Sequence, residues 1–150
     1  NFKALTTNDY NDWGTLVEWR KFCSKFATLF VDVDGVIAIN ENPHGSGSHN
    51  WTSFRPIEEN IMPLIEGQNN GDFSIVFTTS RSEKFRETLS MQMDALGFRD
   101  YKLLMGLPHA KRILINDFAN TNAYPTALAI NLERNSRHLS SYLNPLFPNS

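Results

Sequence analysis

The sequence is short of cysteine, of excess charge and of long hydrophobic runs, and each shortage excludes a class of protein. Cys23 is the single cysteine among 150 residues, so an internal disulfide or a Cys-rich zinc site is excluded and a reducing compartment is expected. Lys and Arg number 14 against 16 Asp and Glu, for a net charge of −2, which leaves no basic field to attract nucleic acid or an anionic membrane. No apolar run approaches the roughly 20 residues of a membrane helix, and no segment resembles a signal peptide. We expect a cytoplasmic protein with a small-molecule substrate.

Short, continuous apolar runs alternate along the chain with helical patterns. Continuous apolarity is typical of strands that are covered on both faces, as in a parallel sheet. Apolar residues at helical spacing predict helices over residues 12–26, from Pro56 onward with Pro63 as a kink or stop, and over 82–98. The alternation predicts an α/β domain over residues 26–150, with a doubly wound, Rossmann-like parallel sheet, preceded by a linker helix within residues 1–25. The predicted strands are 27–33, 73–77, 101–106, 112–116 and 127–131.

Two carboxylates interrupt the first apolar run, in the stretch "FVDVDGVIA" (residues 30–38). Burying unpaired carboxylates is costly, so something must compensate Asp32 and Asp34. Residues i and i+2 of an extended chain project to the same side, so both can face one point. The run at 112–116 also ends in a carboxylate, at Asp117. Because carboxylate oxygens are the ligands that Mg²⁺ prefers, we predict that Asp32, Asp34 and Asp117 hold this ion.

Polar residues also follow the run at 73–77. Ser80-Arg81-Ser82-Glu83 fits the S-x-x-E capping box, which opens a helix and leaves backbone N–H groups to bind an anion. Thr79 can donate its hydroxyl to the same anion, and Arg55 and Arg81 are candidates for binding an anionic substrate. A metal, a carboxylate nucleophile and an anion site together predict phosphoryl transfer through an aspartyl phosphate.

These residues resemble the haloacid dehalogenase (HAD) superfamily of phosphohydrolases over roughly residues 26–135. The family's first motif, hhhDxDG, matches residues 30–35. The resemblance implies that Asp32 is the nucleophile and that Asp34 protonates the leaving oxygen and then activates water. It also implies that Thr79 is the Ser or Thr of the second motif, and that Asp117, in "IND", is the metal ligand of the fourth.

The chain departs from the family at the third motif. Related sequences often carry a lysine in "GKP", whereas this chain has Leu107 in "GLP". Lys111 is the nearest replacement and is predicted to be catalytic, with Arg112 and Lys102 as the alternatives. Only about 44 residues separate Asp34 from Thr79, so the resemblance implies a minimal cap and an open site.

The stretch "YNDWGTLVEW" (residues 10–19) resembles the closing segment of bacterial sugar nucleotidyltransferases. Since the chain begins with Asn1 rather than Met, we expect the phosphatase part of a longer, bifunctional enzyme of capsule-polysaccharide or nucleotide-sugar biosynthesis. The predicted activity is Mg²⁺-dependent hydrolysis of a phosphorylated sugar or polyol. The alternative is a catalytically silent module attached to a nucleotidyltransferase, and a homo-oligomer remains open.

Overall fold

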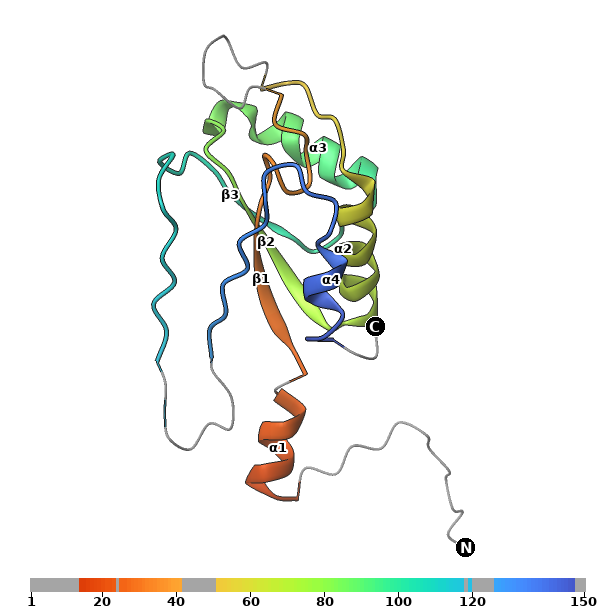
Figure 1. The fold of residues 1–150 in the computed structure, drawn as a ribbon, viewed down its shortest axis with the longest axis vertical. Coiled ribbons are helices and arrows are strands. Elements are labelled where there is room, and N and C mark those ends of the chain that lie inside the picture. The colour runs from red at the N-terminus through yellow and green to blue at the C-terminus, as the bar shows by residue number, and fades with distance from the viewer. Residues whose placement is uncertain (1–13, 24, 42–50, 118, 120–125, 148–150) are drawn as a thin grey trace, which may run out of the picture.

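The structure is a computed structural model, and it describes residues 14–23, 25–41, 51–117, 119 and 126–147. Strands and helices alternate along the middle of the chain, as the apolar pattern predicts (Figure 1). The elements are α1 (Leu16–Cys23), β1 (Ala27–Asp32), α2 (Glu58–Asn70), β2 (Phe73–Thr78), the 3₁₀ turn η1 (Glu83–Phe85), α3 (Arg86–Leu96), β3 (Lys102–Leu104) and α4 (Ser140–Leu143).

The three strands form one parallel sheet in the order β1-β2-β3. Asp32 pairs with Thr78, and Thr78 with Leu104, so the carboxyl ends of all three strands lie at the same edge. The α/β character expected from the sequence is confirmed on this smaller scale. The sheet edge where the polar residues gather is the edge at which ligands bind in open α/β sheets.

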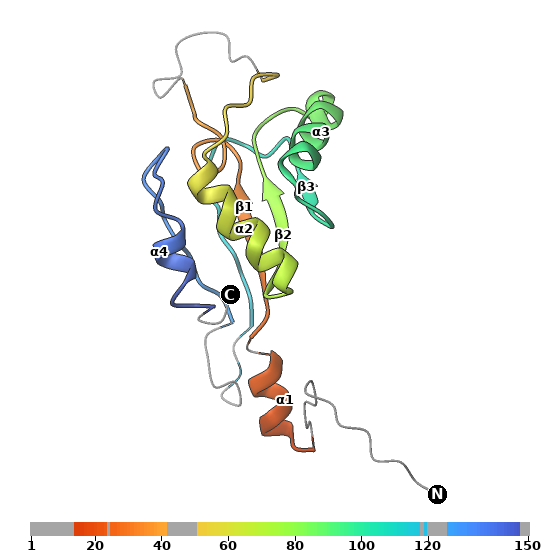
Figure 2. The ribbon, with the colours of Figure 1, turned by 90° about the vertical axis from the view of Figure 1, so that its right-hand side faces the viewer.

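The helices α2, α3 and α4 lie on one side of the sheet (Figures 1 and 2). Their buried side chains and those of β1 and β2 form one core, which includes Ile61, Leu64 and Met93, together with Phe98 just after α3. The Phe77 ring meets the Phe98 ring edge-on at 4.9 Å between centroids, a geometry that aromatic pairs favour. This core fixes the strand ends on which the polar residues sit.

The helix α2 runs through Pro63 rather than stopping there. It continues to Asn70 and ends at Gly71, whose φ of 78° is the left-handed conformation that glycine adopts without strain. Proline removes one helical hydrogen bond, and the burial of Ile61 and Leu64 on either side stabilises the helix across it.

The predicted strands at residues 112–116 and 127–131 are wrong: neither segment forms a strand in the structure. Ile113 is 76% exposed and Ile115 is 90% exposed, so these side chains enter no core among the described residues. Figure 1 shows both segments as extended traces on the side of the sheet opposite to the helices. The described part of the structure therefore covers one face of the sheet with helices, where a doubly wound sheet has both faces covered.

Near the N-terminus, α1 lies within the helix expected over residues 12–26. Thr15 and Glu18 cap it reciprocally: the Thr15 N–H donates to the Glu18 carboxylate (2.9 Å) and the Glu18 N–H to the Thr15 hydroxyl (3.2 Å). Residues 10–13 of the nucleotidyltransferase-like stretch lie outside the described residues. No described helix has the length and apolar character needed to cross a membrane.

Candidate active site

Asp32 and Asp34 come together at the carboxyl end of β1. Asp32 is the last residue of the strand, and the chain turns back at once, with the Gly35 N–H donating to the Ala38 carbonyl at 2.7 Å. Gly35 has a φ of 96°, and a Cβ there would lie 3.1 Å from Cγ of Arg134, so the turn requires glycine. The tight turn keeps the second carboxylate beside the first.

The two aspartates have different surroundings. The Asp32 side chain is 48% exposed and the Asp34 side chain 20% exposed. Partial burial raises the pKa of Asp32 above its ordinary value, the Arg112 guanidinium opposes this, and the Asp34 carboxylate raises the pKa further. Asp32 is thus the more accessible carboxylate, placed where an added positive charge would stabilise its ionised form.

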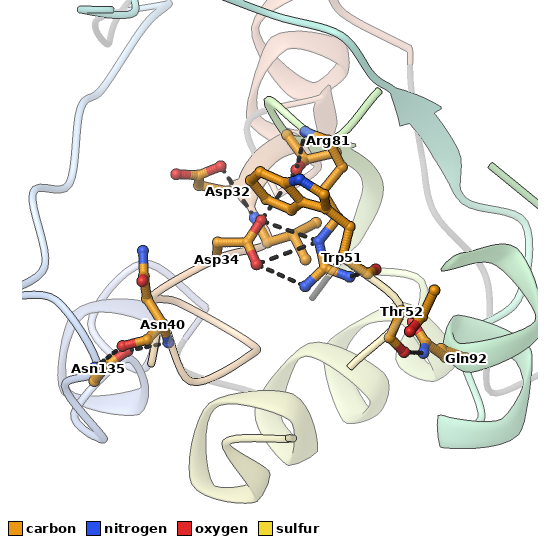
Figure 3. Close-up of polar contacts among 10 residues, drawn as sticks. Asp32, Asp34, Asn40, Trp51, Thr52, Arg81, Gln92 and Asn135 are labelled. Carbon is orange, nitrogen blue, oxygen red and sulfur yellow. Dashed lines mark hydrogen bonds and ion pairs between the residues drawn. The ribbon is translucent and has the colours of Figure 1, made fainter. Parts of the chain in front are cut away.

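Thr79 and Arg81 bring the end of β2 to Asp34. Figure 3 shows the Arg81 guanidinium at the Asp34 carboxylate. The Thr79 hydroxyl donates to Oδ2 of Asp34 at 3.2 Å. Arg81 donates from Nε to the same oxygen at 3.1 Å and from Nη2 to Oδ1 at 2.6 Å. Thr79 is fully buried and Arg81 is 3% exposed. The structure therefore joins three predicted site residues from two strand ends into one hydrogen-bonded group.

Among the three candidates for the missing lysine, Arg112 is the cation placed beside Asp32. Its Nη2 lies 3.8 Å from Oδ1 of Asp32. Lys111 is exposed, and its catalytic role stays a prediction. Lys102 opens β3 and pairs with Val76, two residues before the strand ends. The geometry favours Arg112 as the charge that faces an anion bound at Asp32.

The capping box predicted at Ser80 does not form. The residue before η1 is Ser82, without a side-chain capping bond, and α3 begins only at Arg86. Glu83 pairs instead with Arg86, its Oε2 accepting from Nε at 2.7 Å, so its carboxylate is not available to close a capping box. Ser80 is half-buried and lies in the loop that follows β2, between Thr79 and Arg81 in the chain.

Two other predicted residues lie apart from this group. Arg55 is exposed and forms an ion pair with Glu41 at 3.8 Å. Asp117 is exposed, and its backbone carbonyl accepts a hydrogen bond from the Thr126 hydroxyl. In the described ranges, no three His, Cys, Asp or Glu side chains form a group that could hold a metal ion. The structure thus brings Asp32 and Asp34 together without Asp117.

Two asparagines outside the predicted site hold the turn after Asp34. Asn60, fully buried on α2, donates from Nδ2 to the carbonyls of Val36 and Ser136, both at 2.7 Å. The Asn135 side chain pairs with the backbone of Asn40 in both directions, at 2.7 and 3.1 Å. An asparagine on the apolar stripe of α2 was the available signal, because a buried amide needs partners.

Comparisons with known proteins give no match. No protein-family model matches the chain, and no curated protein or solved structure is significantly similar to it.

Proposed function

We propose that the chain is a Mg²⁺-dependent phosphohydrolase of the HAD superfamily that removes phosphate from a small phosphorylated sugar or polyol. One observation carries the proposal: the exposed Asp32 carboxylate lies beside an Asp34 that is hydrogen-bonded to Thr79 from the neighbouring strand end. Two features support this proposal: the DxDG motif in the sequence, and the proximity of the ends of β1 and β2 in the structure.

Asp32 suits the role of nucleophile because it is the accessible member of the pair. In the first step an Asp32 oxygen forms a bond to phosphorus and the bond from phosphorus to the leaving oxygen breaks. Asp34, which carries the proton taken from water in the preceding turnover, gives that proton to the leaving oxygen. Water then attacks phosphorus and gives a proton to Asp34, and the bond from phosphorus to the Asp32 oxygen breaks. Inorganic phosphate leaves, and the Asp32 carboxylate is regenerated. The Asp34 carboxylate held by Thr79 and Arg81 is the form that accepts this proton.

Arg112 supplies positive charge near the attacked group. Its Nη2 at 3.8 Å from Asp32 offsets repulsion between the carboxylate and an incoming phosphate. A preorganised charge of this kind typically accounts for about 10²- to 10³-fold in rate. Arg112 thus takes the place of the lysine that the chain lacks at Leu107.

The donor set at the end of β1 is compatible with Mg²⁺. Asp32 offers accessible carboxylate oxygens, the ligand type this ion prefers, and Asp34 remains a predicted second ligand, whose oxygens accept from Thr79 and Arg81. Burial raises the pKa of Asp32, and the neighbouring Asp34 carboxylate raises it further. The ion, when bound, would neutralise charge on the phosphate and on the two carboxylates. Asp117 remains a predicted third ligand, which a Mg²⁺ titration of Asp117→Ala tests through its effect on the metal dissociation constant.

A phosphate-release screen tests the function. Wild type is assayed against sugar, polyol and nucleotide phosphates, with Mg²⁺ and with EDTA, beside Asp32→Asn and the control Glu59→Gln. Glu59, on α2, is an exposed carboxylate that pairs with Arg137, so its loss should not change the rate. We expect Mg²⁺-dependent release that Asp32→Asn abolishes. Release that survives in Asp32→Asn would contradict the mechanism, and no release from any substrate would favour a catalytically silent module.

The same proposal includes the cellular compartment and the pathway in which the enzyme acts. The resemblance of residues 10–19 to nucleotidyltransferases supports a cytoplasmic enzyme of capsule-polysaccharide or nucleotide-sugar synthesis, linked to such a domain. Preference for sugar phosphates over nucleotides in the screen would support it.

A further inference from the structure

Arg81 is the most completely buried cation described beside the site, and each of its three guanidinium nitrogens donates to a protein acceptor. Nε and Nη2 hold the two oxygens of Asp34, at 3.1 and 2.6 Å. Nη1 donates to the Trp51 carbonyl at 3.1 Å. With 3% of the residue exposed, little of this fork is left to meet a substrate.

Residues 51–54 lie against the other side of the same guanidinium. Its Cζ is 5.9 Å from the centre of the Trp51 ring and 5.8 Å from that of Phe54, distances at which a cation is attracted by an aromatic face. The Thr52 carbonyl is held separately by Nε2 of Gln92 at 3.0 Å (Figure 3). Arg81 therefore bridges the Asp34 carboxylate and this segment.

We propose that Arg81 is a positioning residue, which aims the Asp34 carboxylate and fastens residues 51–54 beside it, and that it does not bind the substrate phosphate. The proposal deepens the proposed function, on which it rests for the role of Asp34. Because Asp34 serves the leaving oxygen, the leaving group must lie next to Asp34. Residues 51–54 then form the wall that the sugar or polyol part of the substrate meets.

The planar fork of arginine is needed for this arrangement. A guanidinium can bond two carboxylate oxygens and a third acceptor in one fixed geometry, whereas an ammonium is a point charge on a flexible stem. Arg81→Lys therefore keeps the charge and removes the bridge. The matched control is Arg86→Lys. Two nitrogens of Arg86 donate to the Glu83 carboxylate and Arg86 also donates to the Leu103 carbonyl, but these contacts lie on an exposed surface.

The first test reads the bridge without turnover. In a Trp13→Phe, Trp19→Phe background, Trp51 is the sole tryptophan, and its emission and its quenching by acrylamide report its surroundings. We expect Arg81→Lys to shift the emission to longer wavelength and to speed quenching, and Arg86→Lys to do neither. Asp34→Asn, which weakens the bridge from its other end, should act on Trp51 in the same direction. Unchanged Trp51 emission and quenching in both Arg81→Lys and Asp34→Asn would overturn the proposal.

The second test separates positioning from phosphate binding. With the substrate found by the screen, we expect Arg81→Lys to lower kcat by about 10- to 100-fold, the scale of a small misplacement of a reacting group. The inhibition constant of inorganic phosphate should stay at the wild-type value. A rise in that constant parallel to the loss of kcat would instead assign Arg81 to the phosphate. Failure of the proposed function can be told apart from failure of this proposal. In the first case wild type hydrolyses no substrate, and the Trp51 measurement still decides whether the bridge exists.

Discussion

Asn60 ties together the turn that carries Asp34, the helix α2 and the segment before α4, so its removal should destabilise the fold. Its Nδ2 donates to the carbonyls of Val36 and Ser136, and its Oδ1 accepts from the Leu139 N–H at 3.1 Å. Each such bond contributes about 0.5 to 1.5 kcal/mol net. Loss of all three in Asn60→Ala therefore costs about 1.5 to 4.5 kcal/mol, since the half-buried carbonyls of Val36 and Ser136 and the buried Leu139 N–H all lose this partner.

Urea unfolding followed by circular dichroism measures this cost as a shift in the free energy of unfolding. The control is Asn69→Ala, because Asn69 is exposed on the same helix and exposed substitutions usually stay within about 0.5 kcal/mol. Asn60→Asp should also destabilise, since it keeps an acceptor for Leu139 but points a carboxylate at two carbonyls. If Asn60→Ala unfolds within about 0.5 kcal/mol of wild type, as an exposed substitution does, the three hydrogen bonds do not act as described.

Three further predictions concern the site and the core. The pKa of the Asp32 carboxyl is raised, chiefly by burial. The stability that this carboxyl contributes is therefore full below its ordinary pKa of 3.8 and is lost as the pH rises through the folded-state pKa. Asp32→Asn should therefore raise Tm at pH 7 in EDTA, and this gain in Tm should vanish in acid. Gly67→Ala should destabilise the fold by about 1 to 3 kcal/mol despite the helix propensity of alanine, because the added Cβ would lie 2.3 Å from the Phe73 ring. A higher Tm for this variant in thermal unfolding would contradict this packing. Arg112→Ala should lower kcat by about 10²- to 10³-fold while Lys111→Ala leaves it near wild type, and the reverse result would return the catalytic role to Lys111.

The sequence correctly predicts those strands whose apolar run also finds a neighbouring strand with which to pair. The runs at 27–33, 73–77 and 101–106 become β1, β2 and β3, because each has a neighbour with which to pair. The runs at 112–116 and 127–131 are as apolar and form no strand in the structure. An apolar run shows that side chains favour burial, and it does not specify which surface buries them.

The candidate site divides in the same way. The spacing of Asp32 and Asp34 and the polar end of β2 are local features, so their meeting could be predicted. The bridge from Arg81 to Trp51 joins residues 30 positions apart, and no local pattern reports it. Glu83 shows the opposite error, since a local motif predicted a cap while a competing partner, Arg86, took its carboxylate.

Chemical trapping of the phosphorylated protein is the most direct test of the proposed reaction. Wild type is mixed with Mg²⁺ and the substrate found by the screen, quenched with borohydride during turnover, digested and analysed by mass spectrometry. Borohydride reduces an aspartyl phosphate to homoserine, so we expect the reduced residue at position 32 and an unmodified Asp34. Turnover in which position 32 is never reduced, or reduction at another carboxylate, would contradict Asp32 as the nucleophile.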